Sequence, residues 1–196
     1  LLMLGLWAAW SCQDNSDKNR LSKNTSDLVR AEQLKTRGNY DSAIVFFKKS
    51  ADYNLKLNQY PDWVRSISGL VDCYKLKGNL DEAMQIADQA LSDAIPRTDT
   101  SGNLYNNLIL KKANLLSDMR QFGKAAALFD RNITIYLKKS SAVDTGLALA
   151  YNGIGTLNLL QNNYNAALDA YYKAINTYEK SNHTRNINYS GSLQNI

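Results

Sequence analysis

Histidine, cysteine and proline are scarce in this sequence of 196 residues, which contains one His, two Cys and two Pro. Catalysis usually needs a base, a nucleophile and an orienting group held together, and the one histidine, His183, lies in a polar segment. Cys12 and Cys73 form no CxxC spacing and no disulfide framework. We therefore expect no catalytic, cofactor or metal site. Because the only prolines are Pro61 and Pro96, long stretches remain free to form helices.

The sequence also lacks a concentrated block of charge of one sign. The net charge is +5, yet no run of Lys and Arg is longer than a pair such as Lys48-Lys49 or Lys138-Lys139. Proteins that bind nucleic acid usually gather basic residues on one face. The scattered charges favour a mildly basic solvated surface, and we expect no nucleic acid to bind through this region.

The one long apolar run comprises residues 1–10. Ten residues rise about 15 Å as a helix, which is half of a bilayer core. That length is typical of the hydrophobic region of a signal peptide rather than of a membrane span. No initiator Met and no basic region precede it, so we expect the natural N-terminus to lie upstream.

The apolar run ends in Ser11 and Cys12 and is followed by the polar residues 13–24. A hydrophobic run that ends in small residues and Cys resembles a bacterial lipobox, and Ala9, Ser11 and Cys12 carry the resemblance. It implies cleavage before Cys12, lipidation of Cys12, and a membrane-anchored protein of the bacterial cell envelope, periplasmic or surface-exposed. An uncleaved anchor and a buried apolar N-terminus are the alternatives. We predict a signal segment over 1–12, a polar tether over 13–24 and a helical array over 25–196.

Four segments of the array repeat one pattern, starting at residues 38, 78, 120 and 162 with spacings of 40, 42 and 42. A turn-forming or polar residue is followed two positions later by a large apolar residue and three further on by Ala43, Ala83, Ala125 or Ala167. Apolar residues at spacings of three and four on both sides mark one face of a helix. Each unit is therefore a helix, a tight turn and a second helix. We predict helices over 25–37, 41–59, 62–77, 80–94, 103–119, 122–138, 143–161 and 164–180.

Small residues at these positions have a packing reason, because only Ala or Gly lets antiparallel helices approach to about 8 Å. Four residues after the alanines come Phe47, Ala87, Phe129 and Tyr171, and we expect the aromatic residues among them to fill the space against the next unit. Likewise, Gly153-Ile154-Gly155 is predicted to lie inside a helix as a packing feature rather than in a phosphate-binding loop.

The residue at each turn tells how the chain reverses there. Gly38 and Gly78 suit the positive φ of a helix C-terminus, and Asn162 tolerates the same conformation. Arg120 is a poor residue for positive φ, so we expect that turn to be wound differently.

The pattern resembles the tetratricopeptide repeat family. The resemblance covers roughly 25–196 and is best in the last unit, where it rests on Tyr151, Ile154-Gly155, Tyr164, Ala167, Tyr171 and Ala174. It implies an all-α, right-handed superhelix of about four helix pairs. The period of 40 to 42 residues exceeds the usual 34, which lengthens the second helices and their following loops. Arg30 and Lys112 lie where the family has an apolar residue.

The end of the sequence repeats as well. Residues 190–196 align with 148–154, so that Leu193 matches Tyr151 and Ile196 matches Ile154. A fifth unit therefore begins, and because a solenoid normally ends in a capping helix, we expect the natural protein to continue.

The family resemblance implies that the first helix of each pair lines a concave groove that binds protein or peptide segments. Asn114 and Asn152 are expected to face the ligand from adjacent units, although a merely solvated face is the alternative. The resemblance favours a non-enzymatic scaffold tethered to a bacterial membrane. The alternative is the sensory half of a larger signalling protein, with a DNA-binding, kinase or caspase-like peptidase output beyond residue 196. The predicted groove residues are Glu32, Lys35, Arg65, Ser68, Asp72, Lys75, Asn107, Lys111, Asn114, Asn152, Thr156 and Gln194.

Overall fold

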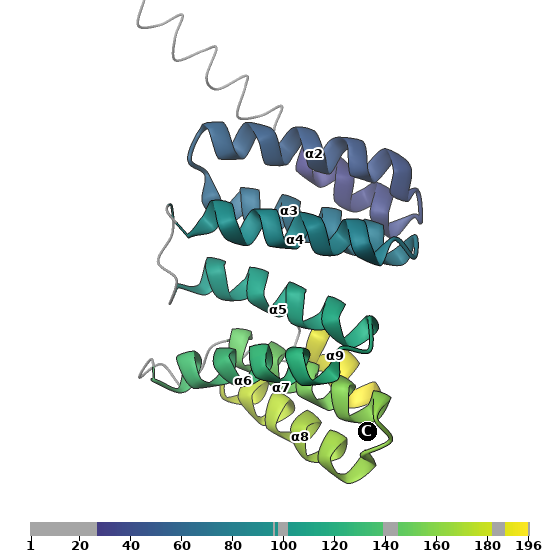
Figure 1. The fold of residues 1–196 in the computed structure, drawn as a ribbon, viewed down its shortest axis with the longest axis vertical. Helices are drawn as coiled ribbons and strands as arrows, with labels where there is room; N and C mark the ends of the chain where they lie inside the picture. The colour runs from purple at the N-terminus through teal and green to yellow at the C-terminus, as the bar shows by residue number, and fades with distance from the viewer. Residues whose placement is uncertain (1–26, 96, 98–101, 139–144, 182–186, 196) are drawn as a thin grey trace, which may run out of the picture. The chain divides into compact units, whose positions relative to one another are not determined.

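The computed structural model describes residues 27–95, 97, 102–138, 145–181 and 187–195, and these residues form helices and the turns at their ends. No strand occurs in the described ranges (Figure 1), so the predicted all-α fold class is confirmed. Among these residues, no helix has both the length and the apolar character needed to cross a membrane. The predicted signal segment and tether, with Cys12, lie outside the described part.

The chain divides into two compact units, one up to Gly78 and one from Asn79. The first unit contains the helical residues 27–36, α2 (Tyr40–Lys56) and α3 (Tyr60–Leu76). The second unit contains α4 (Leu80–Ala94), α5 (Asn103–Asp118), α6 (Phe122–Lys138), α7 (Thr145–Leu160), α8 (Tyr164–Lys180) and α9 (Ile187–Gln194).

The predicted helices match this order, with one clear error at a boundary. The helix predicted over 41–59 ends at Lys56, and the next begins at Tyr60 rather than at residue 62. The reason is Asn58, whose φ of 56° reverses the chain between the two helices. The backbone N–H of Asn58 donates to the carbonyl of Leu55, so the turn satisfies an otherwise open helix end. The fifth unit expected near the end begins as α9, at Ile187.

One left-handed residue marks each three-residue connection between the described helices. Among the described residues, positive φ occurs at Gly38, Asn58, Gly78, Arg120 and Asn162. The expectation that the turn at Arg120 is wound differently was wrong, because Arg120 has a φ of 57°.

Hydrogen bonds explain why Arg120 accepts this conformation. Its N–H donates to the Ser117 carbonyl at 3.0 Å, and the N–H of Gln121 donates to the Leu116 carbonyl at 2.8 Å. This pair of bonds is the Schellman arrangement that closes a helix C-terminus. Helices α5 and α6 are also in contact with each other, which favours this turn despite the unfavourable φ of Arg120.

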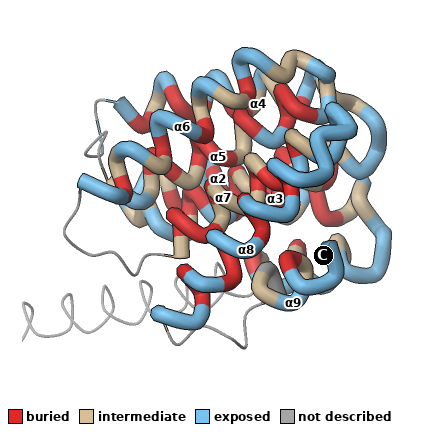
Figure 2. Tube along the Cα trace, turned by 90° about the horizontal axis from the view of Figure 1, so that it is seen from below, coloured by how far each residue is buried: buried red, intermediate tan, exposed pale blue. Residues whose placement is uncertain are grey.

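The repeated small and aromatic residues form the core, as predicted. Ala43, Ala83, Ala125 and Ala167 are all buried, and buried residues recur along helices α2 to α8 (Figure 2).

Glycines on the first helices receive the aromatic rings of the second helices. In the first unit, the Phe47 ring occupies the space that a Cβ on Gly69 of α3 would need, and in the second unit Phe129 does the same at Gly153 of α7. These two rings therefore fill the space against the following helix pair, as expected. Tyr171 differs, because its ring lies against Gly155 of α7, the helix before it. The prediction that the glycines of 153–155 serve packing is confirmed.

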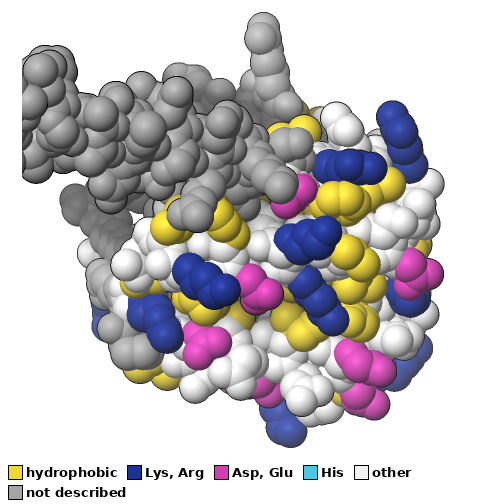
Figure 3. Space-filling model, turned by 90° about the horizontal axis from the view of Figure 1, so that it is seen from above, with side chains coloured by type: hydrophobic (Ala, Val, Ile, Leu, Met, Phe, Trp, Pro, Cys, Tyr) yellow, Lys and Arg dark blue, Asp and Glu magenta, His cyan; other side chains and the backbone are white. Residues whose placement is uncertain are grey.

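Basic side chains lie over aromatic rings on the surface of the first unit. The guanidinium of Arg30 is 4.5 Å from the Phe46 ring centre, and the Lys49 ammonium is 5.3 Å from the same ring. Figure 3 shows Lys and Arg interspersed with apolar and acidic side chains on the face seen from the side of α2. Arg30 therefore covers an apolar ring at a position where the family pattern has an apolar residue. In the second unit Lys112 pairs instead with Asp88, at 2.6 Å.

Candidate peptide-binding groove

The twelve predicted groove residues lie on 27–36, α3, α5, α7 and α9, which are the first helices of their pairs. All twelve are partly or fully exposed, and none is buried. The opposite faces of these helices carry the buried core residues such as Ala31, Val71 and Ala113. The twelve residues therefore lie away from the packed faces of their helices, and their contact with a ligand stays a prediction.

Ion pairs organise the groove residues of the first unit. The ammonium of Lys35 lies 2.7 Å from a carboxylate oxygen of Glu32 and 3.9 Å from one of Asp72. It also lies 5.6 Å from the centre of the Phe47 ring. Lys35 thus joins the first helical segment to α3, and its charge is balanced by the two carboxylates.

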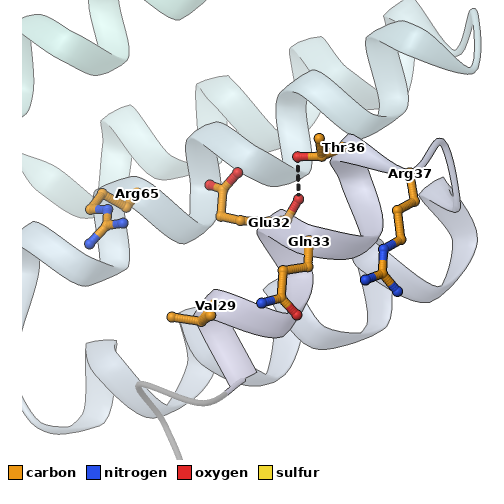
Figure 4. A pocket seen from close by; sticks show the side chains of 6 residues that line it. All are labelled: Val29, Glu32, Gln33, Thr36, Arg37 and Arg65. Atoms are coloured by element: carbon orange, nitrogen blue, oxygen red, sulfur yellow. Dashed lines mark hydrogen bonds between the residues drawn. The ribbon is translucent and has the colours of Figure 1, made fainter.

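A hollow of about 350 Å³ lies beside this row of charges. Five of its side chains come from the first helical segment and the turn after it, and the sixth comes from α3 (Figure 4). The hollow is lined by Val29, Glu32, Gln33, Thr36, Arg37 and Arg65.

The sequence pattern predicted only two of these six residues, Glu32 and Arg65. The other four were missed because the predicted stripe followed positions 32 and 35, whereas the hollow extends one step around the helix. One signal could have revealed it. Val29 lies beside the buried positions Leu28 and Ala31, yet 48% of its surface is exposed. The signal is weak by itself, because single exposed apolar residues are common on protein surfaces and others such as Val45 and Leu57 occur in the same unit.

The groove residues of the second unit are mostly amides and hydroxyls, and some already contact neighbouring helices. The side-chain oxygen of Asn152 accepts a hydrogen bond from the Ser192 hydroxyl of α9 at 3.2 Å. The Thr156 hydroxyl lies 3.3 Å from the Tyr171 hydroxyl of α8. Asn114, on α5, is exposed. Asn152 therefore contributes to packing as well as to the predicted groove, whereas Asn114 faces solvent.

Cys73 lies among the groove residues in sequence but points into the core. It is fully buried, and burial raises the pKa of its thiol to about 11. A thiol with such a pKa stays protonated at neutral pH and is a poor nucleophile. Across the described ranges, no group of His, Cys, Asp and Glu side chains could hold a metal ion.

Comparison with known proteins agrees with this geometry. Residues 104–180 match the tetratricopeptide repeat family. The fold is similar to that of BtubC (BKLC) from P. vanneervenii, with a TM-score of 0.66, 15% identity and 84% of this chain covered. It is also similar to a putative kinesin light chain with nearly identical TPR-like repeats from Podosopora anserina, with a TM-score of 0.62, 13% identity and 89% coverage. The chain spans 66% of the length of the first and 83% of the second. No curated protein is significantly similar in sequence.

Proposed function

We propose that this chain of tetratricopeptide repeats is a non-enzymatic scaffold that binds protein or peptide segments with the exposed faces of its first helices. Repeats of this type form a scaffold suited to protein interaction. The segment bound is extended and lies against polar side chains that can pair with its backbone, as Asn does through both donor and acceptor atoms.

One observation carries this proposal. All twelve predicted groove residues are left at least partly exposed, although the helices that bear them are otherwise packed. A polar face that stays at least partly exposed is available for contacts with a ligand, even where members such as Asn152 also contact a neighbouring helix. In the first unit that face is also hollowed, which allows a bound side chain to be partly enclosed.

Photo-crosslinking in cells tests the proposal. A photoreactive amino acid replaces Ser68 of α3 or Asn107 of α5 in the full-length protein, and control proteins carry it at Lys56 of α2 or Lys173 of α8. The control positions are exposed and lie on second helices. We expect discrete crosslinked proteins from the groove positions alone, identified by mass spectrometry. The same products from all four positions, or no product from Ser68 and Asn107, would contradict the proposal.

We further propose that a lipid on Cys12 tethers the scaffold to a membrane of the bacterial cell envelope. The apolar run 1–10 followed by Ser11 and Cys12 supports this proposal. Acyl chains bind firmly, because each buried CH₂ contributes about 0.8 kcal/mol.

Metabolic labelling with a palmitate analogue in a bacterial host measures lipidation directly. We expect the wild-type protein to be labelled and Cys12→Ser to be unlabelled, with Cys73→Ser labelled like the wild type. Equal labelling of wild type and Cys12→Ser, or none of either, would rule the anchor out.

A further inference from the structure

The hollow of the first unit has more positive charge than its own carboxylate can balance. Three of its lining residues are charged, namely Glu32, Arg37 and Arg65. The Glu32 carboxylate is already paired with the Lys35 ammonium at 2.7 Å. Arg37 makes no ion pair with any described residue, and Arg65 has only a long contact of 3.4 Å with Asp62 on its own helix. Both guanidinium groups therefore remain able to bind an anion.

The two arginines lie at opposite ends of the hollow. Figure 4 shows Arg65 on α3 at one end and Arg37 at the other, with Val29, Glu32 and Gln33 between them. A single small anion cannot occupy both ends. Two carboxylates on one extended chain can, since successive residues of such a chain advance by about 3.3–3.6 Å. Guanidinium groups suit this task because they hold a carboxylate through two parallel hydrogen bonds.

The floor between the arginines offers both apolar and hydrogen-bonding contacts. Val29 is 48% exposed and can cover a small aliphatic side chain. The exposed amide of Gln33 can pair with a peptide backbone. The Thr36 hydroxyl donates to the Glu32 carbonyl at 2.8 Å, so its oxygen is left to accept. A hollow of about 350 Å³ holds a few side chains rather than a folded domain.

We propose that this hollow binds an extended acidic peptide segment. Two carboxylate side chains of the segment bind Arg37 and Arg65, and a small aliphatic residue between them lies on Val29. The proposal rests on the scaffold function proposed above and names the class of segment that its first unit recognises.

Peptide selection tests the proposal, because reversing the charge of the two arginines should reverse the charge of the peptides that bind. Random ten-residue peptides displayed on phage are selected against the full 196-residue chain in mild detergent. The same selection is made against Arg37→Glu/Arg65→Glu and against Lys49→Glu/Lys56→Glu. The second variant makes the same charge change in the same unit, on α2 and outside the hollow. Both arginines are exposed, so circular dichroism should show unchanged melting for the hollow variant.

We expect the wild type and the α2 variant to select peptides with two acidic residues flanking an aliphatic one. The hollow variant should select basic residues instead. A synthetic copy of the most enriched peptide, measured by calorimetry, should bind Arg37→Ala/Arg65→Ala at least tenfold more weakly and Lys49→Ala/Lys56→Ala within twofold of wild type. Val29→Asn should weaken binding severalfold, and binding should decline with added salt.

Other outcomes separate the two proposals. Acidic peptides bound equally by wild type and hollow variant would overturn the assignment to the hollow. Selected peptides without acidic residues would overturn the acidic class. In both cases the scaffold proposal survives if those peptides compete with the crosslinks at Ser68 and Asn107. If no peptide is enriched on any of the three proteins and no crosslink forms, both proposals fail.

Discussion

The two units join similar helices in different ways. In the first unit the left-handed turn residues stand at 38, 58 and 78, so one three-residue turn recurs every 20 residues. In the second unit the same turn occurs at 120 and 162, within helix pairs, and longer connections join one pair to the next. Helices α2 to α8 are all 15 to 17 residues long. The change of period from 40 to 42 residues therefore arises in the connections and not in the helices.

The units also differ in the chemistry of their exposed first helices. Residues 27–78 contain nine basic and six acidic side chains, whereas 79–196 contain eleven and ten. The groove residues of the first unit are mostly charged and joined by ion pairs, while those of the second include four polar residues without charge besides Gln194: Asn107, Asn114, Asn152 and Thr156. Binding at the first unit should therefore depend on salt more strongly than binding at the second.

Filling the glycine sites should show whether both units pack in the same way. Gly69→Val in the first unit and Gly153→Val in the second force three carbons into space held by Phe47 and Phe129. Overpacking of this kind costs about 3 kcal/mol. The exposed Gly123 has no neighbour that a Cβ would meet, so Gly123→Val should change the free energy of unfolding by under about 0.5 kcal/mol.

Urea unfolding measures all three variants, and removal of the opposing ring supplies the control. Phe129→Ala added to Gly153→Val should recover part of the lost free energy of unfolding, because it removes the ring that the Val side chain would meet. A loss at Gly69 alone, with none at Gly153, would show that the second unit relaxes where the first cannot.

Alkaline pH should destabilise each unit through one buried side chain that loses a proton, a thiol in the first unit and a phenol in the second. Burial raises the pKa of Cys73 to about 11 and that of Tyr178 to about 12. Both folded-state pKa values lie above the ordinary values of 9.0 and 10.0. Stability is therefore complete below pH 9 for Cys73 and below pH 10 for Tyr178, and is lost as the pH rises toward the folded values. By linkage, the loss at pH 10.5 is about 2 kcal/mol for Cys73 and about 1 kcal/mol for Tyr178.

The measurement compares urea unfolding at pH 8 and pH 10.5. Cys73→Ala and Tyr178→Phe should each shrink the difference between the two pH values, whatever they cost at pH 8. An unchanged difference in either variant would show that the group is solvated when folded.

The order and type of the helices could be predicted because the sequence repeats. A single turn such as Gly38-Asn39-Tyr40 is a weak signal, but four aligned copies with buried alanines define the helix pairs. The turn at Asn58 was not predicted because Trp63 lies three residues after Tyr60, at the position where the other copies have Ala. The positive φ of Arg120 was not predicted because the intrinsic preference of Arg opposes this conformation. Contacts between helices outweigh that preference.

The groove could be predicted only in part. The exposed stripe on each first helix follows from the positions of the buried residues, and its role as a groove stays a prediction. The hollow depends on how Arg65 of α3 sits beside residues 29–37, which is a matter of helix contact across about thirty residues of sequence. Nothing in the spacing of either helix alone reveals that contact.

Substitutions at the left-handed turn residues should change the free energy of unfolding moderately, and in opposite directions for different residues. A left-handed conformation costs about 1–2 kcal/mol for a residue other than Gly. We therefore expect Gly78→Ala to lower the free energy of unfolding by about that amount, and Arg120→Gly and Asn58→Gly to raise it by somewhat less. Thermal melts check this. If Arg120→Gly is neutral while Asn58→Gly stabilises, the Arg120 side chain makes compensating contacts that the Asn58 side chain lacks.

The smallest effects concern the two basic residues found where the family pattern has apolar ones. Arg30 lies over the Phe46 ring in the first unit, and Lys112 pairs with Asp88 in the second. Both sites are partly solvated, so Arg30→Met and Lys112→Met should each change stability by under about 1 kcal/mol.

The two substitutions should respond differently to salt. An ion pair between exposed groups is screened at 0.5 M NaCl, so the cost of Lys112→Met should nearly vanish there. The flat guanidinium of Arg30 lies over the ring, and we expect this stacked contact to be less sensitive to salt than the ion pair. Urea unfolding at 0.05 and 0.5 M NaCl measures both. Equal salt responses would show that Arg30, too, acts mainly through its charge, and would remove this contrast between the units.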